Sequence, residues 1–427
     1  ASDDVGLTAE GASRTVYDPT AGTGGMLLVA ARALKELNPD IEVVLAGQEL
    51  MSTGYAIGKA DLLIQGGEPD AIRHGDTLLT DLYEGEQFEY ILSNPPFGTD
   101  WEVQQQSVKE QAKVPGSRFS HGLPSKDDGQ MLFLAHVASK LMPAGPNGAG
   151  GRGAVVSNGS PLFTGAPESG PDKIRAWLLE NDLVDAIIQL PTNMFYGTGI
   201  STYVWILDTN KEEHRKGFVQ LIDASGCWSV PDKGLGEKRR EMKESDRKRV
   251  LEEYAGFEDT EISKVLTPAD LGFRDVKVTK QKRLRVEVTP EAVAQVLEHK
   301  SAVPEHAEVL ADVADVKFND LPEALKAAAK KRGVKMLAGM IDEVLEAVGV
   351  PDENAEPSVD RKGKPILDLA FSMTERIPLT EDVGEHMTRE VLPFAPDVIW
   401  DEEAAKVGYE IPFKRVFYRP TPVRSLE

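Results

Sequence analysis

The stretch "RTVYDPTAGTGGMLLVAARALKEL" (residues 14–37) joins a short apolar run, a glycine-rich turn and a segment whose apolar residues recur at helical spacing. The run RTVYD is typical of a β-strand, and residues 24–37 predict a helix. Glycines in the turn permit positive φ angles and let a ligand approach the backbone closely. The stretch therefore predicts the first strand, turn and helix of an α/β fold.

The same alternation of short apolar runs and helical patterns continues through the first half of the chain. It is typical of βαβ units, in which helices cover a mostly parallel sheet. We therefore predict a doubly wound α/β fold with a mostly parallel sheet of about seven strands, which binds ligands at the carboxyl ends of its strands. The further strands are expected at residues 41–49, 88–94, 152–158, 183–190 and 201–208, with 217–223 as a possible edge strand.

Composition and charge narrow the class of protein. The chain has 427 residues, of which 41% are hydrophobic and 28% charged, and it contains no apolar run of the roughly 18 residues that a membrane span needs. The single cysteine, Cys227, excludes an internal disulfide and a cysteine-rich zinc site. The start of the chain resembles neither a signal peptide nor a basic presequence, so we expect a cytoplasmic protein.

The formal net charge of −22 is the opposite of what a protein needs to hold nucleic acid on its own. Either nucleic acid is not the substrate, or another chain supplies most of the contacts. The basic residues are partly concentrated in the charged run "KGLGEKRREMKESDRKRVLEEY" (residues 233–254). We interpret this run as an exposed helix or linker, and favour a solvated face over a nucleic-acid contact.

A chain of this length is expected to form more than one domain, because single cores stop growing near 250 to 300 residues. The sequence predicts a first domain over residues 1–230 and a charged linker with one or two strands over 231–289. Residues 290–427 are expected to be mainly helical, with a loop at 350–365, where prolines and charges are frequent.

The turn "DPTAGTGG" (residues 18–25) lies where a helix N-terminus favours an anionic group. Its glycine spacing is not that of the dinucleotide fingerprint. The carboxylate of Asp18 would repel a pyrophosphate but suits a ligand that carries an ammonium or sulfonium. This favours S-adenosylmethionine over a dinucleotide, while a purely structural turn is an equal alternative.

Two further acids follow predicted strands. Glu49 ends the second strand, where a carboxylate accepts hydrogen bonds from ribose hydroxyls; a neighbour of a helix N-cap is the alternative. Asp76, in "HGDTL", is placed to accept from an adenine amino group, although a turn aspartate is the favoured interpretation of the residue taken alone.

The motif "NPPF" in "YILSNPPFGTD" (residues 90–100) ends another predicted strand with a stiff corner. The side-chain oxygen of Asn94 and the carbonyl of Pro95 are two acceptors for the N–H groups of an exocyclic amine. Hydrogen bonds to both would draw the nitrogen towards tetrahedral geometry and direct its lone pair at a methyl donor. Phe97 offers a flat face on which an extruded base stacks.

The motifs "DPTAGTGG", "GQEL", "HGDTL" and "NPPFG", in this order, resemble those of the DNA methyltransferases that modify adenine at N6. The segments "SRFSHGLPSKDDGQMLFLAHVASKLMP", "SNGSPLFTG" and "IIQLPTNMFYGTGISTYVWIL" resemble the modification subunit of type I restriction-modification systems. The resemblance runs almost continuously from Thr15 to Ser229 and resumes in two later stretches.

The resemblance implies a class I S-adenosylmethionine-dependent methyltransferase fold, S-adenosylmethionine as the cofactor and no metal ion. It implies that Glu49 binds the cofactor's ribose and Asp76 its adenine. The implied cofactor residues are Asp18, Thr20, Gly22, Gly24, Gly25, Glu49, Asp76 and Thr77, and the implied catalytic residues are Asn94, Pro95, Pro96 and Phe97.

The resemblance also implies that the connection at residues 98–129 covers the target base. The basic residues expected to touch DNA phosphates there are Lys109, Lys113, Arg118 and Lys126. Scattered basic residues that only keep a loop soluble are the alternative.

The implied partners are double-stranded DNA, a specificity subunit, a restriction subunit and a second copy of the chain. The specificity subunit would read the DNA, which accounts for the acidity, and would dock on residues 290–427. Members of the family carry an N-terminal helical domain and a segment resembling "EFYTP", whereas about fourteen residues precede the first strand here. A truncated chain and a divergent member are both consistent with this. The rival functions are methylation of RNA bases or of a glutamine amide, and a non-catalytic scaffold.

Overall fold

The computed structural model describes residues 7–145, 150–233 and 236–419, which form two compact units. The first unit consists of Ala1–Phe273, Pro378–Thr380 and Lys406–Glu427, and the second of Arg274–Ile377 and Glu381–Ala405. This division differs from the boundaries at 230 and 289 that the sequence predicts. The charged run stays with the first unit, and the chain returns to that unit twice after residue 273.

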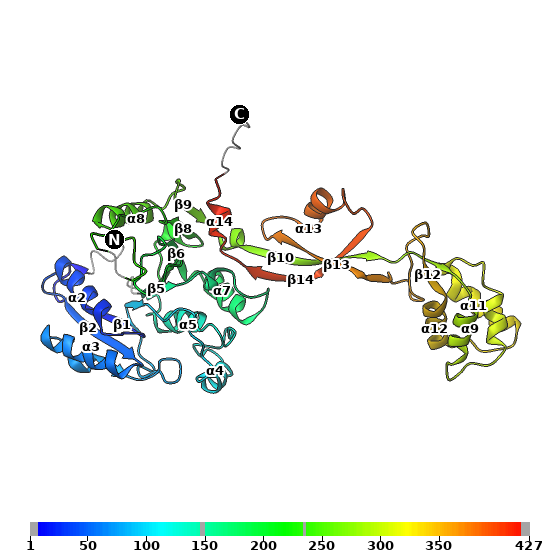
Figure 1. The fold of residues 1–427 in the computed structure, drawn as a ribbon, viewed down its shortest axis with the longest axis horizontal. Helices are drawn as coiled ribbons and strands as arrows, with labels where there is room; N and C mark the ends of the chain where they lie inside the picture. Colours follow the sequence, from blue (N-terminus) through cyan, green and yellow to red (C-terminus); the bar gives the residue numbers. More distant parts are fainter. Residues whose placement is uncertain (1–6, 146–149, 234–235, 420–427) are drawn as a thin grey trace, which may run out of the picture. The chain divides into compact units, whose positions relative to one another are not determined.

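The first unit is built on a nine-stranded sheet in the order β3-β2-β1-β4-β5-β7-β6-β8-β9. Strands β1, β2, β5, β6, β8 and β9 of this sheet are labelled in Figure 1. Five neighbouring pairs are parallel, whereas β7 is antiparallel to both its neighbours and β9 is antiparallel to β8. The strands are β1 (Ser13–Asp18), β2 (Glu42–Glu49), β3 (Ile72–His74), β4 (Tyr90–Ser93), β5 (Arg152–Ser157), β6 (Val184–Gln189), β7 (Tyr203–Asp208), β8 (Val219–Asp223) and β9 (Ser263–Leu266).

The doubly wound, mostly parallel sheet that the sequence predicts is confirmed, with two strands beyond the predicted seven. The prediction that residues 217–223 form an edge strand is wrong, because β9 pairs with the outer side of β8. About forty residues separate β8 from β9, and a pairing at that distance leaves no local pattern in the sequence.

Helices cover the first part of the sheet on both faces. Neighbouring residues of β1 point to opposite faces. Val16 packs with Leu27 of α2 (Gly25–Leu37) and Leu62 of α3 (Ser52–Ile64), while Tyr17 packs with Leu134 of α5 (Gln130–Lys140). The glycine-rich turn of residues 18–25 therefore leaves the sheet between two packed layers.

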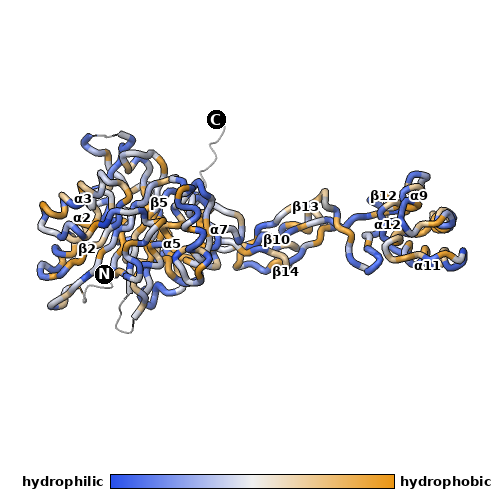
Figure 2. Tube along the Cα trace, turned by 90° about the horizontal axis from the view of Figure 1, so that it is seen from below, coloured by the Kyte–Doolittle hydropathy of each residue, from blue (hydrophilic) through white to orange (hydrophobic). Residues whose placement is uncertain are grey.

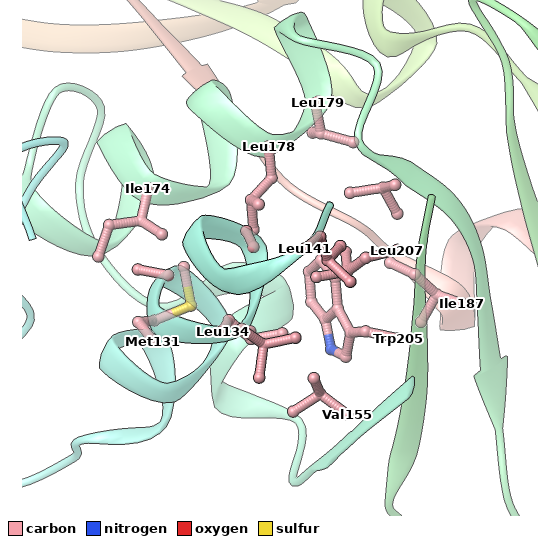
Figure 3. Packing of buried hydrophobic residues seen from close by; sticks show 14 of the residues in the cluster. Met131, Leu134, Leu141, Val155, Ile174, Leu178, Leu179, Ile187, Trp205 and Leu207 are labelled. Carbon is pink, nitrogen blue, oxygen red and sulfur yellow. The ribbon is translucent and has the colours of Figure 1, made fainter. Parts of the chain in front are cut away.

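The largest hydrophobic core of the first unit lies between the sheet and helices α5 and α7 (Gly170–Glu180) (Figure 3). Nine of the eleven residues of α5 are buried, as expected of a helix that is apolar on most sides. Trp205 is fully buried in this core and donates from its indole Nε1 to Ser157 Oγ over 3.1 Å. Figure 2 shows the hydrophobic residues concentrated in this interior, around β5 and α5.

The later part of the first unit contains short or exposed elements. Helix α4 (Gln105–Ala112) lies in the connection after β4, and α6 (Ser160–Phe163) follows β5. Helix α8 (Glu244–Gly256) forms the second half of the charged run and buries only Val250, in agreement with the predicted exposed helix. Residues 234 and 235 of that run lie outside the described residues. Helix α14 (Phe413–Val416) comes near the end of the chain.

The second unit contains four helices that share one core: α9 (Pro290–Leu297), α10 (His306–Ala311), α11 (Leu321–Lys331) and α12 (Ala338–Val348). The short strands β11 (Leu284–Val286) and β12 (Gly349–Pro351) pair antiparallel before and after them. Helices in this part of the chain agree with the predicted helical character of residues 290–350.

The mainly helical character predicted for the rest of residues 290–427 is not what the structure shows. The strands β13 (Leu367–Pro378) and β14 (Val398–Tyr409) have twelve residues each and form a sheet in the order β13-β10-β14 with β10 (Gly272–Gln281). The short helix α13 (Val383–His386) lies between them in the chain. About ninety residues separate β10 from β13, so local patterns do not reveal this sheet. Across the described ranges, no helix is long and apolar enough to cross a membrane.

Candidate active site

Four predicted motifs meet at the carboxyl ends of β3, β2, β1 and β4, which are consecutive in the sheet. Hydrogen bonds join the turn after β1 to the other three. Glu49 Oε2 accepts from Gly22 N over 2.8 Å. Thr77 Oγ1 donates to the carbonyl of Pro19 over 2.5 Å, and the hydroxyls of Thr20 and Ser93 lie 3.0 Å apart. Side chains as far as 73 positions apart in the sequence thus meet in one connected cluster.

The turn after β1 depends on glycine at two positions. Gly22 and Gly24 have φ angles of +55° and +75°, which disfavour any residue with a Cβ. At Gly24 a Cβ would also lie 3.0 Å from Ile72 Cδ1, whereas at Gly22 and Gly25 it would meet nothing within 4 Å. The backbone of this turn is therefore open to a ligand at Gly22 and Gly25 and closely packed at Gly24.

Asp18 ends β1 and is almost completely buried. Its Oδ1 accepts from the backbone N and the hydroxyl of Thr20 over 2.9 and 3.2 Å. The pKa of the Asp18 carboxyl is raised from 3.8 to about 7: burial raises it most, the two hydrogen bonds from Thr20 lower it, and the nearby Glu49 raises it. A group that accommodates a negative charge at this cost suits a site that receives a cation.

This pKa predicts how stability changes with pH. The folded state favours protonated Asp18. The free energy of unfolding therefore falls by up to about 1.4 kcal/mol per pH unit as the pH rises from the ordinary pKa of the carboxyl to the raised one. We expect Asp18→Asn to remove the loss, so that the stability of the variant relative to the wild type grows from about pH 4 to about pH 7 and is constant above. Urea unfolding of both proteins at several pH values measures this. Parallel stability curves would contradict the raised pKa.

Glu49 has the position of a helix N-cap neighbour, the alternative considered from the sequence, and its contact with a ribose remains a prediction. Its Oε2 accepts from the turn at Gly22, and its Oε1 accepts over 2.6 Å from the backbone N of Met51, the N-cap residue of α3. The side chain is therefore fixed between two loops. Each carboxylate oxygen keeps a further lone pair, so the predicted ribose contact is compatible with these bonds.

Asp76 has the geometry of a turn aspartate. Its Oδ1 accepts from the backbone N of Leu78 and Leu79 over 2.9 and 3.3 Å, and its Oδ2 accepts from Gln104 Nε2 over 2.7 Å. The hydroxyl proton of Thr77 is also committed, to the Pro19 carbonyl. Contact of these two residues with an adenine remains a prediction.

The NPPF corner opens on a cavity of about 610 Å³. Asn94 is exposed, Pro95 is buried and Phe97 is half-buried. Among the residues that the structure describes, none hydrogen-bonds to the Asn94 amide. The cavity is lined by Asn94, Pro95, Pro96, Phe97, Gly98, Asn158, Phe195, Tyr196, Gly197, Thr198 and Ile200. All four predicted catalytic residues therefore face one cavity.

The structure adds to the site a loop that sequence reasoning did not single out, at residues 192–200 between β6 and β7. Its Phe195 ring meets the ring of Phe97 edge-on, with 6.2 Å between centroids and 85° between planes. Asn158, after β5, completes the wall. The signal in the sequence was the glycine and aromatic pattern "NMFYGTG" after a strand, which carried only the family resemblance.

The connection at residues 98–129 has a core of its own, in which Trp101, Val108 and Phe119 pack with Leu78 and Leu132. The connection is fixed to the loop after β3 that contains Asp76, which we name the Asp76 loop. There Gln111 and Arg118 donate to the carbonyls of residues 77–79.

The interpretation of Arg118 as a phosphate contact is wrong. Its guanidinium is directed inwards, to the Thr77 carbonyl over 2.6 Å and to His136 Nδ1 over 3.0 Å. Burial, together with the Arg118 charge, lowers the pKa of His136 well below its usual value. Lys113 and Lys126 pair with Glu110 and Glu102, and contact of these lysines and of Lys109 with DNA remains a prediction. Arg118 fixes the connection to the cluster of strand ends.

Two other observations concern cysteine and metal chemistry. Cys227 is buried, which raises the pKa of its thiol. In residues 7–145, 150–233 and 236–419, no group of three or more His, Cys, Asp or Glu side chains is arranged to hold a metal ion.

Comparison with known proteins gives concordant results. A family model described as N-6 DNA Methylase matches residues 5–292. The MjaIX methylase subunit of a type I restriction enzyme from Methanocaldococcus jannaschii is 25% identical over 338 residues, which cover 78% of this chain and 56% of the relative. The HindI methylase subunit from Haemophilus influenzae is 26% identical over 58% of this chain and 53% of the relative. The chain thus spans about half the length of these relatives.

Among solved structures, the methyltransferase subunit of a type I restriction-modification system from Streptococcus thermophilus matches with a TM-score of 0.50 and 29% identity. The match covers 61% of this chain and 51% of that one. It supports the class I methyltransferase fold that the sequence resemblance implies. Because the family model covers more than half of the residues, the chain belongs to the N-6 DNA methylase family.

Proposed function

We propose that this protein is a site-specific DNA methyltransferase that transfers a methyl group from S-adenosylmethionine to N6 of adenine. It acts as the modification subunit of a type I restriction-modification complex. The observation that supports this most strongly is the junction of motifs at one sheet edge, where the hydrogen-bonded turn, Glu49 and Ser93 lead directly to the NPPF corner and its cavity.

The residues of the turn fit S-adenosylmethionine. The buried Asp18 carboxylate is stabilised in its charged form by a nearby cation, and the sulfonium and ammonium of this cofactor are cations. The open backbone at Gly22 and Gly25 accommodates the methionine end beside Thr20, and Glu49 retains lone pairs for two ribose hydroxyls. When bound, S-adenosylmethionine supplies an electrophilic methyl group.

The protein's contribution to the reaction is the orientation of the amine. The adenine amino nitrogen is a weak nucleophile because its lone pair is delocalised into the ring. The Asn94 oxygen and the Pro95 carbonyl accept hydrogen bonds from the two N–H groups of this amine, which turns the lone pair of the nitrogen out of the ring plane. The exposed Asn94 amide, which no described residue engages, is available for this role. Phe97 stacks on the extruded base, and Phe195 bounds it at the edge.

The partners that we propose are double-stranded DNA, a specificity subunit, a restriction subunit and a second copy of this chain. A separate subunit that reads DNA is consistent with the net charge of −22, because the methyltransferase then does not carry the whole DNA contact. We propose that the specificity subunit docks on residues 290–427, whose four-helix cluster presents many charged side chains.

The rival functions are less well supported. A methyltransferase for RNA bases or a glutamine amide would use the same Asn-Pro-Pro-Phe corner, but the family match favours DNA. A scaffold that binds no cofactor would not need a buried carboxylate beside an open glycine turn.

Two measurements test the proposal. Calorimetric titration with S-adenosylmethionine is expected to show one site per chain. Transfer of labelled methyl groups to mixed-sequence duplex DNA, with the specificity subunit co-expressed, is expected to give N6-methyladenine, whereas RNA of the same sequence is not modified. Cofactor binding without transfer to DNA would contradict the assignment of DNA as the substrate. Absence of cofactor binding would contradict the assignment of the protein as a methyltransferase.

A further inference from the structure

A short basic segment is bound to the loop that walls the cavity. Residues 236–240, which we name the basic strap, have the sequence GEKRR. The backbone N of Arg239 and of Arg240 both donate to the carbonyl of Asn193, over 2.9 and 3.1 Å. The backbone N of Glu237 donates to the carbonyl of Tyr196 over 3.1 Å, and Asn193 Nδ2 donates back to the Glu237 carbonyl over 3.3 Å. The strap and the loop are therefore one structural element.

Close packing holds both ends of the strap. Gly236 has a φ angle of +57°, and a Cβ there would lie 2.6 Å from the Tyr196 carbonyl oxygen. At the other end, Arg240 Nη1 donates to Thr192 Oγ1 over 2.8 Å, and its guanidinium lies 4.2 Å from the ring centroid of Trp228. The position of the strap beside the loop is thus determined by backbone bonds and by contact, not by charge.

The loop that carries the strap is part of the cavity wall. Tyr196, Thr198 and Ile200 line the cavity together with Asn94, and Tyr196 is 66% exposed. A strand of nucleic acid that delivers a base to Asn94 must therefore pass close to the strap.

The cations of the strap are not neutralised within the protein. Lys238, Arg239 and Arg240 form no ion pair with a carboxylate in the described parts of the chain. Other exposed lysines, such as Lys113 and Lys216, do pair with neighbouring acids. Arg239 Nη1 donates to the carbonyls of Gly236 and Lys238, which leaves its charge without a counter-ion. Three adjacent positive charges without a carboxylate partner in the described residues are unexpected in a chain with a net charge of −22. A row of phosphates is an anion that matches such a row of cations.

We propose that the basic strap binds the phosphates of the DNA strand on either side of the extruded adenine. This inference rests on the proposed function and extends it to a surface. It replaces the interpretation of the first part of the charged run as a merely solvated face, while the α8 part remains solvated. Lys238 and Arg239 are the phosphate contacts, and Arg240 combines such a contact with support of the loop.

Binding of a fluorescein-labelled 30-base-pair duplex of mixed sequence, measured by anisotropy between 50 and 200 mM KCl, tests the proposal. Each lost phosphate contact lowers the slope of log K against log salt by about 0.9. For the full chain with Lys238→Gln and Arg239→Gln we therefore expect a slope smaller by about 2, so that the salt effect over this range falls roughly tenfold. Arg240 is left in place because it supports the loop.

The matched control is Lys248→Gln with Arg249→Gln on α8, which removes the same charge from exposed positions of the same run. Its slope is expected to equal that of the wild type. An unchanged slope in the strap variant, or an equal decrease in both variants, would overturn the proposal. Methyl transfer and cofactor titration are measured separately, so inactivity of the wild type would count against the proposed function while the salt slopes still decide the role of the strap.

Discussion

Asn94→Ala is expected to lower the rate of methyl transfer by about a thousandfold or more while leaving the affinity for S-adenosylmethionine within about twofold. The variant loses one of the two acceptors that orient the amine. Cofactor affinity is retained because the predicted cofactor residues lie on β1, β2 and the loop after β3. The fold is also retained, because Asn94 is exposed and no described residue depends on its amide. Single-turnover transfer to DNA and calorimetric titration of the cofactor measure the two quantities.

Two further variants define the chemistry of Asn94. Asn94→Asp keeps an oxygen acceptor at the same place and is expected to retain part of the activity. Asn354→Ala changes an exposed asparagine in the second unit and is expected to leave the rate unchanged. Transfer by Asn94→Ala at close to the wild-type rate would refute the assigned role of the amide.

Asp172→Ala is expected to lower the free energy of unfolding of the first unit by about 3 to 5 kcal/mol. Asp172 and Arg175 are both almost fully buried on α7 and lie 3.2 Å apart. The carboxylate also accepts from the backbone N of Tyr409, at the point where β14 returns to the first unit, over 2.9 Å. Without Asp172 the buried guanidinium keeps only carbonyl partners, and the Tyr409 N–H loses its acceptor.

Urea unfolding followed by tryptophan fluorescence measures this effect, since four of the five tryptophans belong to the first unit. Asp172→Asn keeps an acceptor, so its loss in the free energy of unfolding is expected to be less than half of the loss in Asp172→Ala. As a control, Glu213→Ala breaks an exposed pair with Lys216 and is expected to leave the free energy of unfolding close to that of the wild type. A loss of under about 1 kcal/mol in Asp172→Ala would show that the pair is not important for the attachment of the returning segment.

Much of the sheet and of the candidate site follows from local sequence. The βα units of residues 14–64 carry their own periodicity, and parallel strands bring their carboxyl ends to one edge. Asp18, Glu49, Asp76 and Asn94 are therefore expected at the same end of the sheet, although their order across it, from β3 through β2 and β1 to β4, differs from their order along the chain. The NPPF corner is equally local, because its stiffness comes from two consecutive prolines.

Other features depend on contacts between residues far apart in the chain. Arg118 is a charged residue in a loop, and such residues are expected at the surface. Its guanidinium is nevertheless directed inwards to Thr77 and His136, because the connection at residues 98–129 packs on the loop that contains Asp76. Strands β9, β13 and β14 pair with strands some forty or more residues away, and their pairing leaves no local trace in the sequence.

The sequence by itself determined the type of fold, the order of the motifs and the chemical character of the corner, because helical and strand periodicity and the rigidity of proline act within a few residues. The tertiary structure decided that Phe195 and Tyr196 share the cavity with Asn94, that Arg118 is internal, and that the basic strap lies on the cavity loop. These features depend on which backbone N–H and C=O groups meet across the fold, and such pairings are fixed only when the whole unit packs.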